Sequence, residues 1–307
     1  MKILVTGGAG FIGSHIADAY IAAGHDVVII DNLSTGRKSN VNEKATFIEC
    51  DIRDEKIADI FEQQKFDVVN HQAAQMDVRL SVENPIYDAQ NNVIGFLNIV
   101  QNAAKHNVKK VIYASSGGVV YGEQDYFPAD EKHPQRPYCP YGVTKLTGEK
   151  YLFYYALTFG IKYTAFRYAN VYGPRQNPHG EAGVIAIFLE KLFKKIQPVI
   201  NGDGEQTRDY VYIADVVNAN VAALDRADNE IINIGTGVET NVVEIFQHLN
   251  ELTHAHMPQK NGPGMPGEQR RSVLDISKAK NVLGWQPQVG FRDGLAKTVD
   301  FFKDFEV

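Results

Sequence analysis

A glycine-rich turn between a strand and a helix constrains the fold of this chain more than any other feature. Residues 2–6 predict a buried strand, residues 11–23 predict a helix, and the turn between them carries Gly7, Gly10 and Gly13. Glycines at this spacing allow a tight turn, close approach of a ligand to the backbone, and close packing of the helix on the sheet. The helix N-terminus then offers amides and a positive dipole end to a phosphate. The turn therefore predicts a site for the pyrophosphate of a dinucleotide.

Strand and helix patterns alternate through the first half of the chain. Continuous apolar strands separated by helices are typical of a parallel sheet that is covered on both faces. The predicted fold class is therefore α/β, a Rossmann-type doubly wound parallel sheet with a smaller C-terminal substrate-binding α/β domain. The further strands are predicted at residues 26–30, 46–50, 67–70, 110–115 and 163–167, and the further helices at 55–63, 92–106 and 141–159.

The character of the sequence changes near residue 170. Residues 173–175 and 177–180 are rich in Gly, Pro and Asn, and shorter elements follow them. Such clusters mark loops between periodic segments. We predict a Rossmann-type dinucleotide-binding domain over residues 1–170 and a second domain over residues 171–307, with a strand near 231–234 that returns to the first domain.

Composition limits the classes of partner. The chain has 307 residues, of which 44% are hydrophobic and 22% are charged, as in an ordinary soluble protein. Its net charge of -6 argues against nucleic acid and anionic membranes as partners. No stretch approaches the roughly 18 apolar residues of a membrane-spanning helix. We read Cys50 and Cys139 as reduced, which favours a cytoplasmic location. His71, His254 and His256 have no third ligand at suitable spacing, so no metal site is predicted.

An acidic residue after the second strand indicates which dinucleotide binds. Asp31 follows Gly13 by 18 residues. A carboxylate there accepts hydrogen bonds from ribose hydroxyls and repels a 2′-phosphate, which favours NAD over NADP. Arg37 and Lys38 lie close enough to keep NADP open as an alternative. Asp51 follows the third strand, where it is expected either to flank the adenine or to cap the next helix.

Tyr141 and Lys145 are the strongest candidates for chemistry. On a helix, residues four apart share a face, so the Lys145 ammonium lies beside the Tyr141 hydroxyl. A cation that close favours the phenolate, which makes the tyrosine a candidate general acid/base. Such a pair also arises by chance as an exposed helix pair, so it gains its meaning from the dinucleotide-binding turn upstream.

The order of these motifs carries a family resemblance. With the three glycines, Asp31, Asn92, Ser115-Ser116 and Tyr141-Lys145 in sequence, the chain resembles the extended short-chain dehydrogenase/reductase family. Within it, the chain is most similar to the UDP-glucose (UDP-galactose) 4-epimerase branch, over essentially its whole length. The further stretches that carry this likeness are residues 31–36, 73–75, 167–175, 208–211 and 233–237.

The resemblance implies NAD as cofactor, a UDP-hexose as substrate and a role for each matching residue. The implied catalytic residues are Ser116, Tyr141 and Lys145. Tyr141 and Lys145 are also implied to bind the cofactor. The other implied cofactor-binding residues are Gly7, Gly10, Phe11, Ile12, Gly13, Asp31, Asn32, Ser34, Gly36, Asp51, Ile52, Ala73, Ala74, Gln75, Asn92, Tyr168 and Ala169. The implied nucleotide-sugar-binding residues are Asn170, Val184, Arg208 and Glu268. The resemblance also implies a homodimer packed through the two long helices that follow Asn92 and Tyr141.

The chain departs from the family pattern at two places. Members often place the catalytic hydroxyl at the position of Gly117, so Ser116 is the nearest candidate here. The arginine that usually binds the diphosphate is Met265 in this chain, so Arg270 or Arg271 replaces it or Arg208 acts alone. Arg208 could instead form a surface salt bridge with its neighbour Asp209.

The predicted function is NAD-dependent interconversion of UDP-glucose and UDP-galactose. It proceeds by oxidation at C4, rotation of the 4-keto sugar and re-reduction from the other face. Ser272 matches the position that limits N-acetyl groups, and a small residue there predicts some turnover of UDP-N-acetylhexosamines. The alternatives are a UDP-glucuronate 4-epimerase or decarboxylase, and a sugar-nucleotide 4,6-dehydratase, which would have an Asp-Glu pair in place of Gly117-Gly118. A non-catalytic NAD-binding sensor typically lacks the Tyr–Lys pair.

Overall fold

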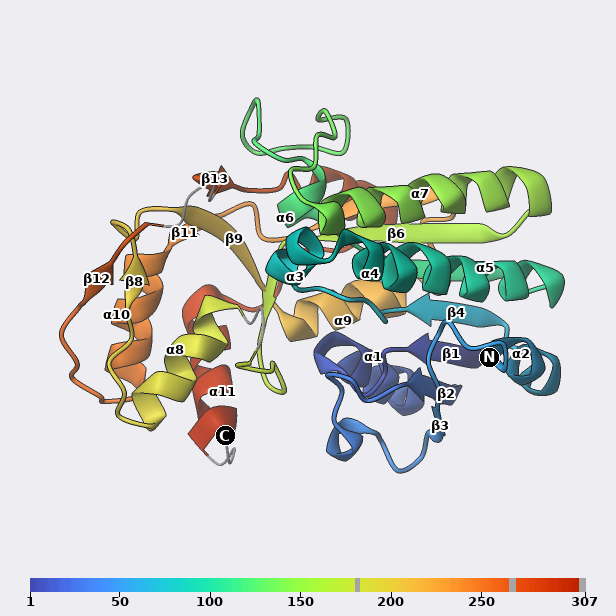
Figure 1. Ribbon diagram of the computed structural model, residues 1–307, viewed down its shortest axis with the longest axis horizontal. Helices are drawn as coiled ribbons and strands as arrows, with labels where there is room; N and C mark the ends of the chain where they lie inside the picture. The colour runs from blue at the N-terminus through green and yellow to red at the C-terminus, as the bar shows by residue number, and fades with distance from the viewer. Residues whose placement is uncertain (180–182, 265–268, 304–307) are drawn as a thin grey trace.

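Seven parallel strands form the main sheet in the computed structural model, which describes residues 1–179, 183–264 and 269–303 (Figure 1). Their order across the sheet is β10-β6-β5-β4-β1-β2-β3, and every pair of neighbours is parallel. The predicted Rossmann-type α/β fold is confirmed. The strands are β1 (Lys2–Thr6), β2 (Asp26–Asp31), β3 (Thr46–Glu49), β4 (Val68–His71), β5 (Lys110–Ser116), β6 (Lys162–Tyr168) and β10 (Glu230–Ile234).

Both faces of this sheet are buried, as the continuous apolar strands require. Successive side chains of a strand point to opposite faces. Ile3 and Val5 of β1 accordingly belong to one hydrophobic cluster, whereas Leu4 between them belongs to another. The first cluster includes residues of α1 (Phe11–Ala22) and α9 (Ile213–Ala222), and the second includes residues of α2 (Ile57–Gln64), α5 (Phe96–Lys105) and α7 (Pro140–Phe159). The helices therefore form a layer on each side of the sheet (Figure 1).

The strand order places the switch point of the sheet beside the glycine-rich turn. β2 and β3 lie on one side of β1, whereas β4, β5 and β6 lie on the other, so the connections after β1 and β4 diverge. Ligands of open α/β sheets bind at such a switch point, outside the carboxyl ends of the strands. Gly7, at a φ of 68°, touches the loop after β4, since an added Cβ there would lie 2.7 Å from the backbone nitrogen of Ala73. A Cβ at Gly13 would lie 2.2 Å from the Gly7 carbonyl oxygen, so both positions require glycine.

A smaller unit follows and lies at the left of Figure 1. Its larger sheet joins β7 (Asn170–Tyr172), β9 (Thr207–Tyr212), β11 (Glu239–Asn241) and β13 (Arg271–Ser272), and β8 (Ile200–Asn201) pairs with β12 (Asn261–Gly262). Leu189 of α8 (Val184–Phe193) and Phe246 of α10 (Val242–Leu252) belong to the same cluster as Ile3 and Val5. One continuous core therefore joins this unit to one face of the main sheet, and α11 (Phe291–Lys303) is the last described helix.

The structure departs from the sequence expectations in the connection between β4 and β5. The predicted helix at 92–106 begins instead as a π-helix, Gln90–Gly95, and continues as α5. Two short helices precede it, α3 (Val78–Glu83), capped by the Asp77 side chain, and α4 (Pro85–Ala89), capped by Asn84. The other short helices are η1 (Lys38–Asn40), α6 (Gly117–Val120) and a second π-helix, Ala279–Leu283.

The predicted strand near 231–234 is β10, which pairs with β6 at the edge of the main sheet. The chain therefore crosses from the smaller unit back to the larger one, and the boundary at residue 170 remains a prediction. None of the helices in the described part of the chain has the length and apolar character needed to cross a membrane.

Candidate active site

Lys145 lies at the centre of the candidate site. Its side chain is 3% exposed, and its ammonium donates a hydrogen bond of 2.8 Å to the backbone carbonyl of Ala114 on β5. The ammonium nitrogen is 5.2 Å from the ring centre of Tyr113 and 5.7 Å from that of Tyr141. Burial lowers the pKa of Lys145 to about 8, and the Asp88 carboxylate opposes that shift. The lysine is thus a buried cation, fixed by the sheet beside the Tyr141 ring.

The first turn of α7 brings Tyr141 to this cation. The helix begins with a proline, which is tolerated where no intrahelical acceptor is needed, and the Cys139 sulfur accepts a hydrogen bond from the Gly142 amide. Gly142 also packs closely on α6, because a Cβ there would lie 2.9 Å from the Val119 carbonyl oxygen. This contact holds α6, and Ser116 at its N-terminus, against the turn that carries Tyr141.

The two serines at the end of β5 have different environments. Ser115 is 3% exposed and donates a hydrogen bond of 2.6 Å to Oε1 of Glu149. Glu149 forms a fully buried ion pair with Arg167 of β6, at 2.7 Å. Ser115 therefore belongs to the core, and the alternation of side chains along a strand directs Ser116 to the other side. Ser116 is the serine available to a substrate.

Packing explains the two glycines that follow. A Cβ at Gly117 would lie 2.6 Å from Cδ1 of Leu274, so this leucine fills the space that a side chain at position 117 would need. A Cβ at Gly118 would have room, at 3.8 Å from both the Ser116 hydroxyl and the Asn170 amide oxygen. The side chains of Ser116 and Asn170 therefore flank the same open space. The predicted catalytic serine and one predicted substrate residue come together there.

Asp31 stands at the end of β2, next to the glycine-rich turn. Its carboxylate accepts hydrogen bonds from the backbone amides of Ala9, at 3.0 Å, and Leu33, at 2.8 Å. Burial raises the pKa of Asp31, and these two amides act in the opposite direction. Gly36 lets the next loop pass close to it, since a Cβ there would lie 2.9 Å from the carboxylate. The acid is therefore oriented before any ligand binds.

Asp51 anchors the loop that carries Asn32. The Asn32 amide donates a hydrogen bond of 2.8 Å to Asp51, and Arg53 donates two more of 2.8 Å each. These contacts, those of Arg53 foremost, hold the pKa of Asp51 well below its usual range. The helix-cap alternative is wrong, because Lys56 is the residue before α2. The remaining predicted members, Ser34 and Ile52, flank these residues in sequence, and the Ser34 amide donates to the Asn32 side chain.

The loop after β4 carries three more of the predicted cofactor-binding residues, Ala73, Ala74 and Gln75. The Ala73 amide lies 3.3 Å from the Thr6 hydroxyl. Asn92, on the π-helix, accepts a hydrogen bond from the Gln75 amide and donates one to the Gln75 carbonyl, at 2.9 and 2.8 Å. Isolated π turns often occur at functional sites. Asn92 thus fixes the backbone of this loop from behind.

Tyr168 and Ala169 lie at the carboxyl end of β6, beside β5. The Tyr168 hydroxyl is buried and accepts a hydrogen bond of 2.8 Å from Asn220 of α9. The Ala169 amide donates to the Ile234 carbonyl of β10. Contact of Tyr168 with a cofactor would therefore involve its ring or backbone rather than its hydroxyl.

The predicted nucleotide-sugar residues are distributed over the smaller unit. Arg208 on β9 pairs in register with Ser272 on β13, whereas Val184 begins α8 and Glu268 lies outside the described residues. Asp209 is buried and accepts hydrogen bonds from Thr236 and Gly237, so it serves that loop and not a surface bridge to Arg208.

The two arginines proposed to replace the one expected at Met265 have carboxylate partners. Arg270 makes two hydrogen bonds of 2.8 Å to Asp203, and Arg271 makes two to Glu239, at 2.9 and 2.7 Å. Arg208 donates to the Thr207 carbonyl. This arrangement favours Arg208 as the phosphate-binding arginine, while Met265 itself lies outside the described residues.

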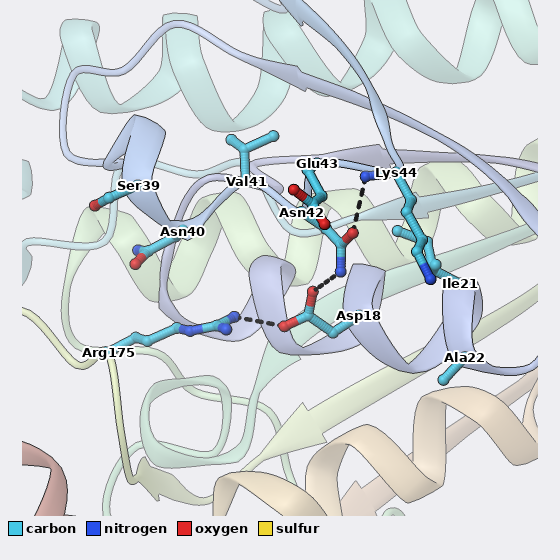
Figure 2. Close-up of a pocket in the computed structure, with 10 residues that line it drawn as sticks. All are labelled: Asp18, Ile21, Ala22, Ser39, Asn40, Val41, Asn42, Glu43, Lys44 and Arg175. Carbon is cyan, nitrogen blue, oxygen red and sulfur yellow. Dashed lines mark hydrogen bonds and ion pairs between the residues drawn. The ribbon is translucent and has the colours of Figure 1, made fainter.

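The structure also has a hollow of about 580 Å³, and none of the predicted site residues lines it (Figure 2). It is bounded by α1, the segment 39–44 and Arg175. Asp18 of α1 bridges its walls, because its carboxylate pairs with Arg175 at 2.8 Å and accepts a hydrogen bond of 2.7 Å from Asn42. Asp18 therefore connects the loop after β7, which carries Arg175, to the larger unit.

The residues at the switch point fit NAD. α1 begins at Phe11, so the amides of its first turn, Ile12 included, have no acceptor within the helix. Glycine in this turn lets a pyrophosphate approach the backbone closely, and the Asp31 carboxylate offers oxygen acceptors to ribose hydroxyls. The same negative charge disfavours a 2′-phosphate. A site with these features defines a Rossmann-type dinucleotide-binding enzyme of the Tyr–Lys class.

Comparison with known proteins supports this assignment to a class of dinucleotide-binding enzymes. Residues 3–235 match the NAD dependent epimerase/dehydratase family, and the chain belongs to that family. It is 43% identical to the UDP-glucose 4-epimerase of Mycolicibacterium smegmatis, over 99% of each chain. It is similar to the crystal structure of the Thermotoga maritima UDP-glucose 4-epimerase with UDP-glucose, with 47% identity, a TM-score of 0.97 and coverage of 99% of each chain. The Thermus thermophilus UDP-glucose 4-epimerase complex with NAD is 41% identical, with a TM-score of 0.94 and coverage of 99% of each chain.

Sequence reasoning missed the residues that pack behind the candidate catalytic pair, Tyr141 and Lys145. Tyr113 underlies the Lys145 ammonium, and its hydroxyl lies 3.4 Å from the Lys145 carbonyl. Thr144 and Asp88 are hydrogen-bonded to each other at 2.9 Å. Thr144 could have been found by its place between Tyr141 and Lys145, but no motif marked Asp88 or Tyr113.

The environments of the two serines predict different effects of their removal. Ser116→Ala should lower the turnover number on the order of 100-fold, because the hydroxyl that is predicted to stabilise the developing oxyanion is lost. Ser115→Ala should leave turnover nearly unchanged but destabilise the fold by about 1 kcal/mol, because a buried hydrogen bond to Glu149 is lost. Steady-state kinetics and thermal unfolding of both variants test this. The reverse assignment of the two effects would contradict it.

Proposed function

We propose that this protein interconverts UDP-glucose and UDP-galactose at C4 of the hexose, with NAD as its resident cofactor. The observation that carries the proposal is the buried Lys145 ammonium, held by the Ala114 carbonyl beside the Tyr141 ring. The site lies at the switch point of the sheet, where a dinucleotide binds. The names of the relatives described above support the same activity.

The residues have separate roles in the reaction. Bound NAD supplies a reversible hydride acceptor. Tyr141 removes the proton of the 4-hydroxyl and later returns it, and Lys145 stabilises its phenolate. The Ser116 hydroxyl donates a hydrogen bond to the C4 oxygen as that oxygen gains charge. The 4-keto sugar turns about its link to UDP, so Arg208 and Asn170 must hold the nucleotide side and leave the hexose mobile.

The packing around Gly117 disfavours dehydration. A 4,6-dehydratase needs an acid beside the catalytic hydroxyl to protonate the leaving C6 oxygen. A side chain at position 117 would require Leu274 to shift, and neither Gly117 nor Gly118 carries an acid. A UDP-glucuronate enzyme would need donors for a C6 carboxylate, and its product distinguishes it from the proposed activity.

The direct test is incubation of the purified protein with UDP-galactose and no added NAD. UDP-glucose should form, because the cofactor is regenerated in each cycle. Tyr141→Phe should reduce the rate by a few hundredfold or more while the protein stays folded and keeps its NAD. A 4-keto-6-deoxy product, reaction with UDP-glucuronate alone, unchanged substrate, or near-normal rates in the variant would each contradict the proposal.

We further propose that the site accepts some UDP-N-acetylhexosamine. Ser272 is in register with Arg208 on the neighbouring strand, so their side chains extend on the same side of the sheet. Ser272 is 4% exposed, and its small side chain beside Arg208 leaves more room for a group at C2 of the sugar than a large residue would.

Ser272→Tyr is expected to abolish turnover of UDP-N-acetylglucosamine and to spare that of UDP-glucose. The larger ring would fill the space at C2, whereas the 2-hydroxyl of glucose needs little of it. Rates with both substrates, measured on one preparation with Ser272→Ala as the matched control, check this. Equal losses with both substrates in Ser272→Tyr would count against the proposed position of Ser272.

We propose that the protein is a homodimer through the helices beside the main sheet. α5 and α7 run side by side (Figure 1). Large apolar side chains are exposed on α7 and the neighbouring segments, among them Ile86, Ile94, Phe153 and Leu157. Apolar side chains gathered in this way are typical of a surface that meets another protein.

Leu157→Glu should convert the dimer into a monomer, because it places a charge at the most exposed of these residues, which is 77% exposed. Light scattering measures the mass directly. Ile196→Glu is a matched control at an exposed apolar residue of the smaller unit and should leave the mass unchanged. A monomeric unaltered protein, or an unaffected dimer in Leu157→Glu, would refute the proposed interface.

A further inference from the structure

A buried carboxylate lies behind Tyr141 and Lys145. Asp88, on the short helix α4, is 0% exposed. Both α4 and the π-helix Gln90–Gly95 pack against α7, the helix that carries the catalytic pair. A charge is rarely buried to this degree unless several donors surround it.

Three side chains converge on this carboxylate. The Thr144 hydroxyl lies 2.9 Å from Oδ2, and the amides of Gln75 and Asn92 donate to Oδ1 at 2.9 and 3.0 Å. Backbone groups fix the orientation of both amides. The Asn92 oxygen accepts from the Gln75 backbone amide, and the Gln75 side-chain oxygen accepts from the Asp77 backbone amide. Both NH₂ groups must therefore face Asp88, which makes Oδ1 an acceptor.

The same three residues belong to the candidate site. Gln75 is on the predicted cofactor loop, Asn92 stands behind that loop, and Thr144 precedes Lys145 on α7. Thr144 also lies 3.0 Å from the Tyr141 carbonyl. Asp88 is thus the point at which the cofactor loop, the π-helix and the catalytic helix are tied together.

Besides Tyr141, which shares the site with Lys145 and is an anion only as the phenolate, Asp88 is the negative charge that acts on Lys145. His71 on β4 is neutral, because burial and the Lys145 charge lower its pKa to about 3. Tyr113 on β5 is a neutral phenol, because burial raises its pKa well above the usual value. Glu149, farther along α7, is paired with Arg167. Asp88 acts on Lys145 in the direction that favours the ammonium.

We propose that Asp88 is a positioning residue of the reaction, which holds Gln75, Asn92 and Thr144 in one arrangement and supplies the negative charge that keeps Lys145 protonated. It touches neither the sugar nor the transferred proton. The inference rests on the proposed function, since it assigns a role within that site. The lysine must remain an ammonium to stabilise the phenolate, so Asp88 extends the active pH range on its alkaline side.

The test compares the pH profile of turnover in Asp88→Asn, Thr144→Val and the unaltered holoenzyme. Asp88→Asn removes the charge, so Lys145 should lose its proton at lower pH. The alkaline limb should then move down by roughly one pH unit, with the KM for UDP-galactose unchanged. Thr144→Val breaks a hydrogen bond but keeps the charge, so turnover should fall while the limb stays in place. Bound NAD per chain and the melting temperature show that each protein is folded and loaded.

An alkaline limb that does not move in folded, NAD-loaded Asp88→Asn would overturn the proposal, and so would a limb that moves equally in Thr144→Val. If Asp88→Asn does not fold, Asp88→Glu takes its place. That variant keeps the charge and alters the geometry, so lower turnover with an unmoved limb is expected, and a moved limb overturns the proposal. Failure of the proposed function would appear earlier, as an unaltered protein that does not convert UDP-galactose.

Discussion

The hydrogen bond from the Lys145 ammonium to the Ala114 carbonyl is the interaction on which the site depends. It ties α7 to the carboxyl end of β5, where the strand leads into Ser116. The lysine thereby keeps a fixed position in an environment that burial makes costly for a charge. Because Tyr141 is one turn earlier on the same helix, its distance from that charge is set by helix geometry. The backbone of α7 therefore already places Tyr141 and Lys145 as the proposed general acid/base chemistry requires.

The sheet supplies the second constraint. Its order reverses between β1 and β4, so the glycine-rich turn and the loop after β4 diverge at the same edge at which β5 presents Ser116. At their base these loops touch, where Gly7 lies against Ala73. A dinucleotide at this switch point would have its pyrophosphate at α1 and its far end toward β5 and β6. The continuous core joins the smaller unit, and hence Asn170 and Arg208, to the same frame.

Much of the larger unit could be predicted from the sequence because its signals are local. The apolar run at residues 2–6 and the glycines after it predict β1 and the start of α1 directly, and Asp31 is marked by its place at the end of β2. The π turn at Gln90–Gly95 could not be predicted, because the spacing of apolar residues does not separate a π turn from an α-helix. The short elements of the smaller unit are set by long-range pairing, such as that of β9 with β7, β11 and β13.

The site was predictable where a residue type is tied to a chemical task, as for Tyr141 and Lys145. Residues that act through others carry no such signal. The different roles of Ser115 and Ser116 became clear only from the contact of Ser115 with Glu149. The glycine at position 117 is explained only by the position of Leu274. Asp88 is one aspartate among many in the sequence, and only its three converging donors distinguish it.

The most direct measurement is a crystal structure of the Tyr141→Phe protein with NAD and UDP-glucose bound. The account predicts that the C4 oxygen of the glucose lies within about 3 Å of the Ser116 hydroxyl, with the ring of residue 141 beside it and the Lys145 ammonium still on the Ala114 carbonyl. A C4 oxygen turned away from residue 141, or a sugar held with Lys145 displaced from β5, would contradict it.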